Sequence, residues 1–453
     1  MNHTRGVNMR IFGQRPLVSF IVSVFNLERY IGACLDSIMI QPFDDYEIVL
    51  VNNNSTDGSD AICREYAAHN KQIRYHALTG EPIFGRAVIY GTQKARGQYI
   101  HYVDGDDMLA PGAYGEIVHI LRSDAPDVLF GRFSTVLEES IINFTDKSFQ
   151  TERINGRAKD QVLEYLTEAQ PFNVATWRLI FSRKLREHFR TPVKRLKEPV
   201  NIFHDVYVSV RTLLSARSVH YVDTLVYSYR VRSSSISRIT AAGNISECCR
   251  LLLSLAWLIR CRAKTEQERG FVRAYMEHFQ YQLVAALCTM SDEQITESAA
   301  AIDKYLKQKD LKGTPSEDCG CSVINTLISE GAAAGLARLR DRCFSKVEQI
   351  ARRALAKGGD IYFAPTGQIG LFLKTSFKAS GISISGFFDN DVQKNGMLVD
   401  GIPVHLPAAV TKIAGDKRVT ILIGSGYQNV REELRTQFIS LGIDESDLLI
   451  VEF

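Results

Sequence analysis

The first hundred residues alternate between short hydrophobic runs and segments with helical spacing. The runs predict strands over residues 17–25, 46–52 and 73–78, and a fourth strand that runs into an acidic turn over residues 98–107. The first two are rich in β-branched and aromatic side chains, as in strands buried on both faces. Between the predicted strands, hydrophobic side chains recur every three or four positions, which predicts helices over residues 29–40 and 86–96. Repeated strand–helix units imply right-handed crossovers, so we expect an α/β fold with a mostly parallel sheet.

The pattern changes twice further along the chain. From residue 240 to residue 357 the hydrophobic residues keep helical spacing, which predicts a helical region. After Gly358-Gly359 strands and helices alternate again. We therefore expect an N-terminal extension, a first α/β domain, a helical region and a Rossmann-like α/β domain, with the bounds 1–15, 16–239, 240–357 and 358–453.

The composition is that of an ordinary globular protein, because 45% of the 453 residues are hydrophobic and 23% are charged. The formal net charge of +3 lacks the basic excess of a nucleic-acid binder, so no nucleic-acid partner is expected. The nine scattered cysteines favour a reducing, cytoplasmic compartment. The N-terminus lacks a signal-peptide core, and no apolar stretch reaches the roughly 20 residues of a spanning helix. Peripheral attachment to the inner face of the cell membrane stays open.

An acidic turn follows the fourth predicted strand. It contains Asp104, Asp106 and Asp107. Ligands of parallel sheets bind outside the carboxyl ends of the strands, where this turn is expected. Crowded carboxylates repel one another unless a cation joins them, and Mg²⁺ or Mn²⁺ takes oxygen ligands together with substrate phosphates. A merely polar turn is the alternative interpretation.

Six segments in register with this turn resemble one known family. They are PLVSFIVSVFNLERYIGACLDSI, YEIVLVNNNSTDGS, ARGQYIHYVDGDD, NVATWRLIFSRK, HDVYVSV and YSYRVRSSSIS. Their order and spacing resemble a family-2 glycosyltransferase with the GT-A fold, of the kind that builds bacterial capsular and surface polysaccharides. The resemblance covers residues 16–235, about half of the chain.

The resemblance implies a nucleotide-diphosphate sugar, usually a UDP-sugar, as the donor. Asp104-Gly105-Asp106 resembles the family's D-x-D motif, in which the first carboxylate approaches the ribose and the second holds Mn²⁺ or Mg²⁺ on the diphosphate. The metal neutralises the leaving group. Asp107 supports the turn or touches the sugar. Further donor-binding candidates implied by the family are Val24, Asn26, Asn52, Asn54, Asp57 and Arg86.

The sequence departs from the family at several of these positions. Asn52 to Asn54 stand where relatives usually carry acidic residues that bind the base, although an amide oxygen can still accept from the uracil N3–H. Val88 and Ile89 replace a common Arg-Asn pair. Leu179 replaces a common lysine after the tryptophan. A simple loop before a helix, with Ser55 or Asp57 as N-cap, is the alternative to a base-binding site.

The acceptor side of the site rests on later motifs. His204-Asp205 resembles the family's Glu-Asp pair, which makes Asp205 the candidate base for the acceptor hydroxyl. The alternative is that Asp205 only caps a helix. Trp177 and His204 are acceptor-side candidates, with packing as the alternative for both. Arg230 and Arg232 suit the diphosphate, since arginine presents planar donors.

The C-terminal segment APTGQIG (364–370) resembles a degenerate dinucleotide fingerprint. Only Gly367 and Gly370 of its glycines remain, and Asp389 lies near the position of a ribose-binding acid. A binding or assembly module is favoured over a redox enzyme, and self-association stays open.

We therefore predict an inverting, metal-dependent glycosyltransferase that acts on a saccharide or lipid-linked saccharide acceptor. Two alternatives remain: an inactive nucleotide-sugar-binding protein, and a nicotinamide-dependent sugar oxidoreductase or epimerase acting through the C-terminal segment.

Overall fold

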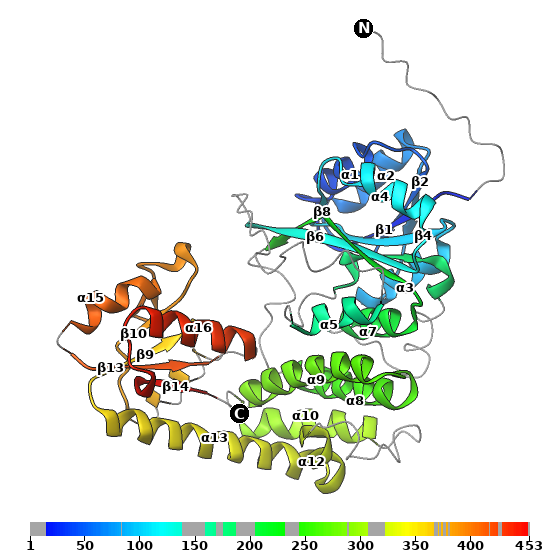
Figure 1. Ribbon diagram of the computed structural model, residues 1–453. Helices are drawn as coiled ribbons and strands as arrows, with labels where there is room; N and C mark the ends of the chain where they lie inside the picture. Colours follow the sequence, from blue (N-terminus) through cyan, green and yellow to red (C-terminus); the bar gives the residue numbers. More distant parts are fainter. Residues whose placement is uncertain are drawn as a thin grey trace. The chain divides into compact units, whose positions relative to one another are not determined.

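The computed structural model is shown in Figure 1. It describes residues 15–82, 84–137, 159–168, 175–186, 204–231, 244–287, 290–306, 322–366, 370, 373–374, 377–378, 381–415, 417–424 and 428–451. The chain forms two compact units, Met1–Ile239 and Thr240–Phe453. Each unit has its own sheet, in the order β3-β2-β1-β4-β7-β6-β8-β5 for the first and β11-β12-β10-β9-β13-β14 for the second.

The first unit is built around its eight-stranded sheet. Its strands are β1 Val18–Val24, β2 Tyr46–Asn52, β3 Ile73–Ala77, β4 Tyr99–Asp104, β5 Met108–Leu109, β6 Val128–Leu137, β7 Leu179–Ser182 and β8 Val219–Val231. The helical segments are α1 Ile31–Met39, α2 Ser59–His69, α3 Phe84–Lys94, α4 Tyr114–Ser123, α5 Lys159–Glu168, η3 Thr176–Arg178, η4 Arg183–Arg186 and α7 His204–Ser215. Strands β1 to β4 pair in parallel, whereas β4–β7, β6–β7 and β5–β8 are antiparallel.

Hydrophobic side chains on both faces explain why β1 and β2 are central strands. Every residue of both strands is buried. Phe20 and Val22 belong to the core that packs against α1 and α4, while Ile21 faces α3. A Cβ added at Gly91 in α3 would lie 2.3 Å from Ile21 Cγ2, so glycine allows this helix to approach the sheet closely.

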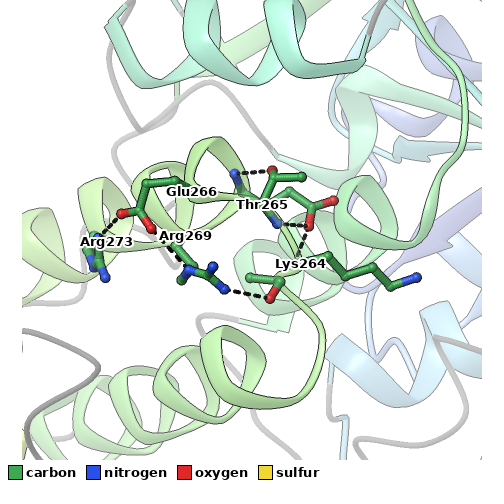
Figure 2. Close-up of polar contacts among 7 residues, drawn as sticks. Lys264, Thr265, Glu266, Arg269 and Arg273 are labelled. Carbon is green, nitrogen blue, oxygen red and sulfur yellow. Dashed lines mark hydrogen bonds and ion pairs between the residues drawn. The ribbon is translucent and has the colours of Figure 1, made fainter.

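The second unit begins with helices that carry their own start signals. They are α8 Asn244–Cys261, α9 Glu266–Leu287, α10 Asp292–Leu306, α12 Ser322–Glu330 and α13 Ala332–Lys357. Figure 2 shows the capping box that opens α9. The backbone N–H of Glu268 donates to Thr265 Oγ1 at 3.2 Å, and Glu268 accepts from the N–H of Thr265 at 3.2 Å. Ser291 and Gln294 form the corresponding pair at the start of α10.

The six-stranded sheet completes the second unit. Its elements are β9 Asp360–Ala364, β10 Gly386–Phe388, η6 Val392–Lys394, β11 Leu398–Val399, β12 Ile402–His405, η7 Pro407–Ala409, α15 Val410–Ala414, β13 Val419–Ile423, α16 Gln428–Ser440, η8 Glu445–Asp447 and β14 Leu448–Ile450. All pairs except β11–β12 are parallel, and the strand order reverses at β9. The predicted Rossmann-like sheet is therefore confirmed.

Helix α13 belongs to the cores of both C-terminal regions predicted from the sequence. Residues of its first half contact α10 and α12, since Ala332 N–H donates to Asp303 at 3.1 Å and Arg338 pairs with Glu330. Its second half contributes to the core beneath the sheet, through Cys343, Val347, Ile350, Ala351 and Ala354. The division at residues 357 and 358 thus falls at the end of a helix that both regions share, and the four-part domain scheme stays a prediction.

Candidate functional site

The acidic turn lies at the carboxyl end of β4 and is tied to the end of β1. Asp107 N–H donates to the Asp104 carbonyl at 2.9 Å, which closes the turn. Gly105 N–H donates to the Ser23 carbonyl at 3.1 Å. A Cβ at Gly105 would lie 2.7 Å from that carbonyl oxygen and 2.9 Å from Leu27 Cδ1. Only glycine therefore allows the turn to approach β1 so closely.

The three carboxylates of the turn occupy different surroundings. Asp104 and Asp106 are half-buried, whereas Asp107 is only 1% exposed. Asp107 Oδ2 accepts from the Tyr227 hydroxyl at 2.8 Å, and its Oδ1 accepts from Arg230 N–H at 2.7 Å. Burial, with the charges of Asp106 and Asp104, raises the pKa of Asp107, and the two hydrogen bonds oppose this rise. Asp104 and Asp106 are thus the carboxylates that solvent can reach.

Strand β8 returns to the acidic turn because β5, which follows the turn directly, pairs with it in antiparallel fashion. Arg230 Nε donates to the Asp106 carbonyl at 2.9 Å. Its guanidinium also lies over the Tyr30 ring, 5.3 Å from the centroid. The structure therefore brings the half-buried Arg230 to the turn, and its contact with a diphosphate stays a prediction. Arg232 lies outside the described residues.

The loops after β1 and β2 are joined by reciprocal hydrogen bonds. Asn26 N–H donates to Ser55 Oγ at 3.1 Å, and Thr56 N–H donates to Asn26 Oδ1 at 2.8 Å. Glu28 N–H donates to Asp57 Oδ2 at 3.1 Å. Asn26 has a φ of 53°, a left-handed conformation that asparagine tolerates. The side chains of Asn26 and Asp57 thus join the two loops, and their contact with the donor stays a prediction.

Asn52 is buried and its amide is bonded within the protein. Its Oδ1 accepts from Ser55 N–H at 3.0 Å. Its Nδ2 donates to Asp60 at 2.9 Å and to the Tyr75 hydroxyl at 3.1 Å. The hydrogen bond from Arg64 is the largest of several that lower the pKa of Asp60 to about 2. Asn52 therefore orients the loop after β2, and its contact with a nucleobase stays a prediction.

Asn54 and Arg86 are exposed and hold the same short segment. Asn54 Nδ2 donates to the Gly80 carbonyl at 2.9 Å, and Arg86 Nη1 donates to the Thr79 carbonyl at 2.7 Å. Val24 is 1% exposed, and its carbonyl accepts from Asn53 N–H at 2.8 Å. Among Asn52, Asn53 and Asn54, Asn54 is therefore the one with an exposed side chain.

Trp177 lies in η3 and packs against aromatic side chains. Its ring stacks on Tyr227 with centroids 4.5 Å apart and on Tyr229 at 5.5 Å. Its carbonyl accepts from His101 Nε2 at 2.8 Å, while the Tyr114 hydroxyl lies 2.6 Å from His101 Nδ1. Burial lowers the pKa of His101 to about 4, so this ring is neutral at pH 7. These contacts fix η3 against β4, and an acceptor contact by Trp177 stays a prediction.

Asp205 lies in the first turn of α7, which begins at His204. Its side chain is half-buried and accepts from Val206 N–H at 2.8 Å. Burial raises the pKa of Asp205 to about 6, against the effect of that hydrogen bond. Helix α7 packs against η3, which in turn is bonded to β4. The His204 side chain lies outside the described part of the structure.

Two residues at the site were missed by the sequence analysis, His101 and Tyr227. His101 is a polar residue inside the hydrophobic strand YIHYV, and this is a signal that could have been used. Tyr227 gives no local signal, because its role depends on the pairing of β5 with β8, about 120 residues apart in the sequence.

The acidic turn offers few protein ligands to a divalent ion. Among the residues that the structure describes, no group of three or more His, Cys, Asp or Glu side chains could hold a metal ion. Mg²⁺ and Mn²⁺ are commonly bound by one or two carboxylates plus substrate phosphates and waters. Asp106, half-buried at the end of a sheet, suits that mode.

The described residues include no helix with the length and hydrophobicity that a membrane span requires.

In the second predicted nucleotide-binding region, the Asp389 carboxylate is already hydrogen-bonded within the protein. Asp389, 6% exposed at the end of β10, accepts from Thr366 N–H at 3.1 Å and from Lys394 Nζ at 2.9 Å. Burial alone would raise the pKa of Asp389, but hydrogen bonds from the Thr366 hydroxyl, Asp391 N–H and Lys394 lower it. A ribose hydroxyl would have to displace them. Gly367 lies outside the described residues, whereas Gly370 is described.

Comparison with known proteins finds a family match within the first unit. The family model for "Glycosyl transferase family 2" matches residues 19–189. The putative glycosyltransferase EpsH of Bacillus subtilis is 30% identical over 223 residues, which cover 49% of this chain and 63% of EpsH. The glycosyltransferase GlyA of Streptococcus pneumoniae is 27% identical over 229 residues, 49% of this chain and 32% of GlyA.

Among solved structures, S. aureus TarS is 16% identical, with a TM-score of 0.48 over 72% of this chain and 55% of TarS. The matches to EpsH and GlyA span less than two thirds of those two proteins. The family match begins within β1 and ends just beyond η4, so it contains the acidic turn and η3. The N-terminal unit is therefore similar to glycosyl transferase family 2 over residues 19–189.

Proposed function

We propose that the N-terminal unit transfers a sugar from a nucleoside-diphosphate sugar to a hydroxyl of a saccharide or lipid-linked saccharide. The acidic turn carries this proposal. It presents Asp104 and Asp106 at the carboxyl end of a central parallel strand, while Arg230 is hydrogen-bonded to the backbone of the same turn. Two carboxylates and a guanidinium gathered at a strand end suit a metal-bound diphosphate better than a merely polar turn.

The proposed chemistry assigns one role to each group. Asp106 would hold Mn²⁺ or Mg²⁺, which neutralises the charge that develops on the departing diphosphate. Asp104 would approach the ribose, and Arg230 would donate to phosphate oxygens. Asp205 would take the proton of the acceptor hydroxyl as that oxygen attacks the anomeric carbon. The new glycosidic bond forms as the bond to phosphate breaks, and attack from the opposite face inverts the anomeric centre.

The environment of Asp205 supports its role as the base. A general base works best when its pKa lies near the operating pH, and burial brings the pKa of this carboxyl to about 6. Its hydrogen bond from Val206 N–H holds one oxygen and orients the group. The pairing of α7 with η3 and of η3 with β4 supports a location on the acceptor side of the acidic turn.

A uridine donor is the finer part of the proposal. Asn54 is exposed, and its Nδ2 is directed to the Gly80 carbonyl, which leaves its Oδ1 to accept from the N3–H of uracil. An acceptor carried on a lipid would bring the enzyme to a membrane surface, and this would account for a peripheral attachment. Synthesis of a bacterial surface polysaccharide would fit such an acceptor.

The alternative redox function receives less support. The carboxylate that would bind a nicotinamide ribose is engaged by Thr366 and Lys394. The test is a panel of UDP-, GDP- and dTDP-sugars with Mn²⁺, with release of the nucleoside diphosphate as the readout, and a separate incubation with NAD(P)H. We expect release from one donor class and no nicotinamide turnover. Oxidation of NAD(P)H without any release from the sugar nucleotides would overturn the proposal.

A further inference from the structure

The hydroxyl of Tyr227 connects two residues of the acidic turn. It accepts from Asp104 N–H at 3.0 Å and donates to Asp107 Oδ2 at 2.8 Å. A phenol has one hydrogen to donate, and here the Asp107 carboxylate receives it. The hydroxyl oxygen also accepts from Asp104 N–H, and this bond fixes the backbone of Asp104, which is predicted to contact the donor. One hydroxyl thus sets both the start and the end of the turn.

The ring that carries this hydroxyl is held firmly. Tyr227 is 1% exposed and stacks on Trp177 at 4.5 Å, with an angle of 16° between the rings. The strand that carries Tyr227, β8, is paired with β5, which follows the acidic turn directly. A buried ring with a stacked partner and a paired backbone has little freedom to move. The position of Asp104 is therefore set by the core of the sheet.

Asp107 contributes to the same arrangement from inside the protein. Both of its carboxylate oxygens accept from β8, one from the Tyr227 hydroxyl and one from Arg230 N–H. At 1% exposure this carboxylate does not reach the surface that a diphosphate would occupy. Asp107 therefore holds Arg230 at the turn, while the Arg230 side chain continues to the Asp106 carbonyl. These hydrogen bonds connect Asp104 to Asp106 through Tyr227, Asp107 and Arg230.

We infer that Tyr227 is a positioning residue for donor binding, which acts through Asp104 and, with Asp107, keeps Arg230 and the half-buried Asp104 and Asp106 in one arrangement. This inference rests on the proposed function, since it concerns the same site. It assigns Asp107 to the support of the turn and not to contact with the sugar.

The test compares Tyr227→Phe with a matched loss of a buried hydroxyl in the same sheet. Tyr99→Phe is the control, because Tyr99 lies at the other end of β4 and its hydroxyl donates only to the Leu121 carbonyl, at 3.5 Å. Nucleoside diphosphate binding is measured by calorimetry in the full chain with Mn²⁺, using the tightest binder among UDP, GDP, CDP and dTDP. Melting temperatures are recorded for every variant.

We expect Tyr227→Phe to weaken nucleoside diphosphate binding by about tenfold, the size of one lost hydrogen bond to a charged network. Tyr99→Phe should bind as the wild type does. Asp107→Asn should weaken binding in the same direction, because whichever way its amide turns, either Tyr227 or Arg230 loses its acceptor. This second variant keeps the test valid if Tyr227→Phe folds poorly.

The outcomes separate the inference from the proposed function. If the wild type binds the diphosphate, and both Tyr227→Phe and Asp107→Asn bind it with the same affinity, the positioning role is overturned and the proposed function stands. A wild-type chain that binds none of the four diphosphates with Mn²⁺ would overturn the proposed function itself. Weakened binding in Tyr227→Phe at a temperature well below its melting point, with normal binding in Tyr99→Phe, supports the inference.

Discussion

Replacing Asp205 by asparagine removes the proposed base with little change of shape. Asparagine can still accept from Val206 N–H through its amide oxygen, so the local contact is kept. It cannot take a proton at neutral pH. We expect turnover to fall by a factor on the order of 10²–10⁴, the usual effect of a lost general base. Affinity for the donor should change little, because the base faces the acceptor.

The pKa of Asp205 gives this prediction a second, quantitative form. A base with a pKa of about 6 is roughly nine tenths ionised at pH 7 and one tenth ionised at pH 5. Only the carboxylate accepts the proton, so activity rises with pH. Wild-type turnover should therefore fall about tenfold between pH 7 and pH 5. The small residual turnover of Asp205→Asn should not follow that curve.

Stability changes with pH in the opposite direction. Burial raises the pKa of Asp205 in the folded chain above that of an unfolded aspartate, so the folded state binds this proton more tightly. This group's contribution to stability is present at low pH and is lost as the pH rises through about 6. Asp205→Asn should accordingly melt no lower than the wild type at pH 8.

The assay is nucleoside diphosphate release with acceptor present, measured from pH 5 to pH 8 for wild type and variant. Asp160→Asn is the control, since Asp160 also lies in the first turn of a helix, α5, and is exposed. It should keep wild-type turnover and its pH profile. Normal turnover in Asp205→Asn, or an unchanged pH profile, would refute the assignment and leave Asp205 with a structural role at the start of α7.

Three further predictions follow from other parts of the chain. Chelation should abolish transfer, and addition of Mn²⁺ or Mg²⁺ should restore it. Asp106→Asn should show negligible turnover at any Mn²⁺ concentration. Full activity in excess chelator would contradict the metal assignment. Gly105→Ala should destabilise the chain by about 1–3 kcal/mol in thermal unfolding and weaken donor binding, because its Cβ would lie 2.7 Å from the Ser23 carbonyl; a neutral effect on both would show that the turn can relax. A chain ending at Ala356 should still bind a nucleotide sugar in calorimetry. It should also bind a hydrophobic dye, because the α13 residues that face the second sheet lose their partners. Loss of nucleotide-sugar binding in a truncated chain that remains folded would place part of the donor site after residue 356.

The central strands and the acidic turn could be predicted because their signals are local. β1 and β2 are buried over their whole length, so continuous hydrophobic runs mark them. The turn follows β4 without interruption, and its glycine and carboxylates are adjacent in the sequence. In such cases the pattern of a few neighbouring residues contains the structural reason.

The surroundings of the site could not be predicted, because they depend on distant pairings. Tyr227 reaches Asp104 and Asp107 only because β8 returns to β5. Asn52 resembles a base-binding residue in sequence, but Asp60 and Tyr75 engage its amide after folding. Helix α13 shows an amphipathic pattern, which does not reveal that its two halves face different partners.

The most direct test of the account is whether Mn²⁺ and a nucleoside diphosphate bind together at the acidic turn. Water-proton relaxation of Mn²⁺ can be followed as UDP is added to the wild-type chain, to Asp106→Asn and to Asp160→Asn. We predict a ternary complex with enhanced relaxation in the wild type and in Asp160→Asn, and none in Asp106→Asn. Equal enhancement in all three proteins would show that the metal and the diphosphate bind elsewhere.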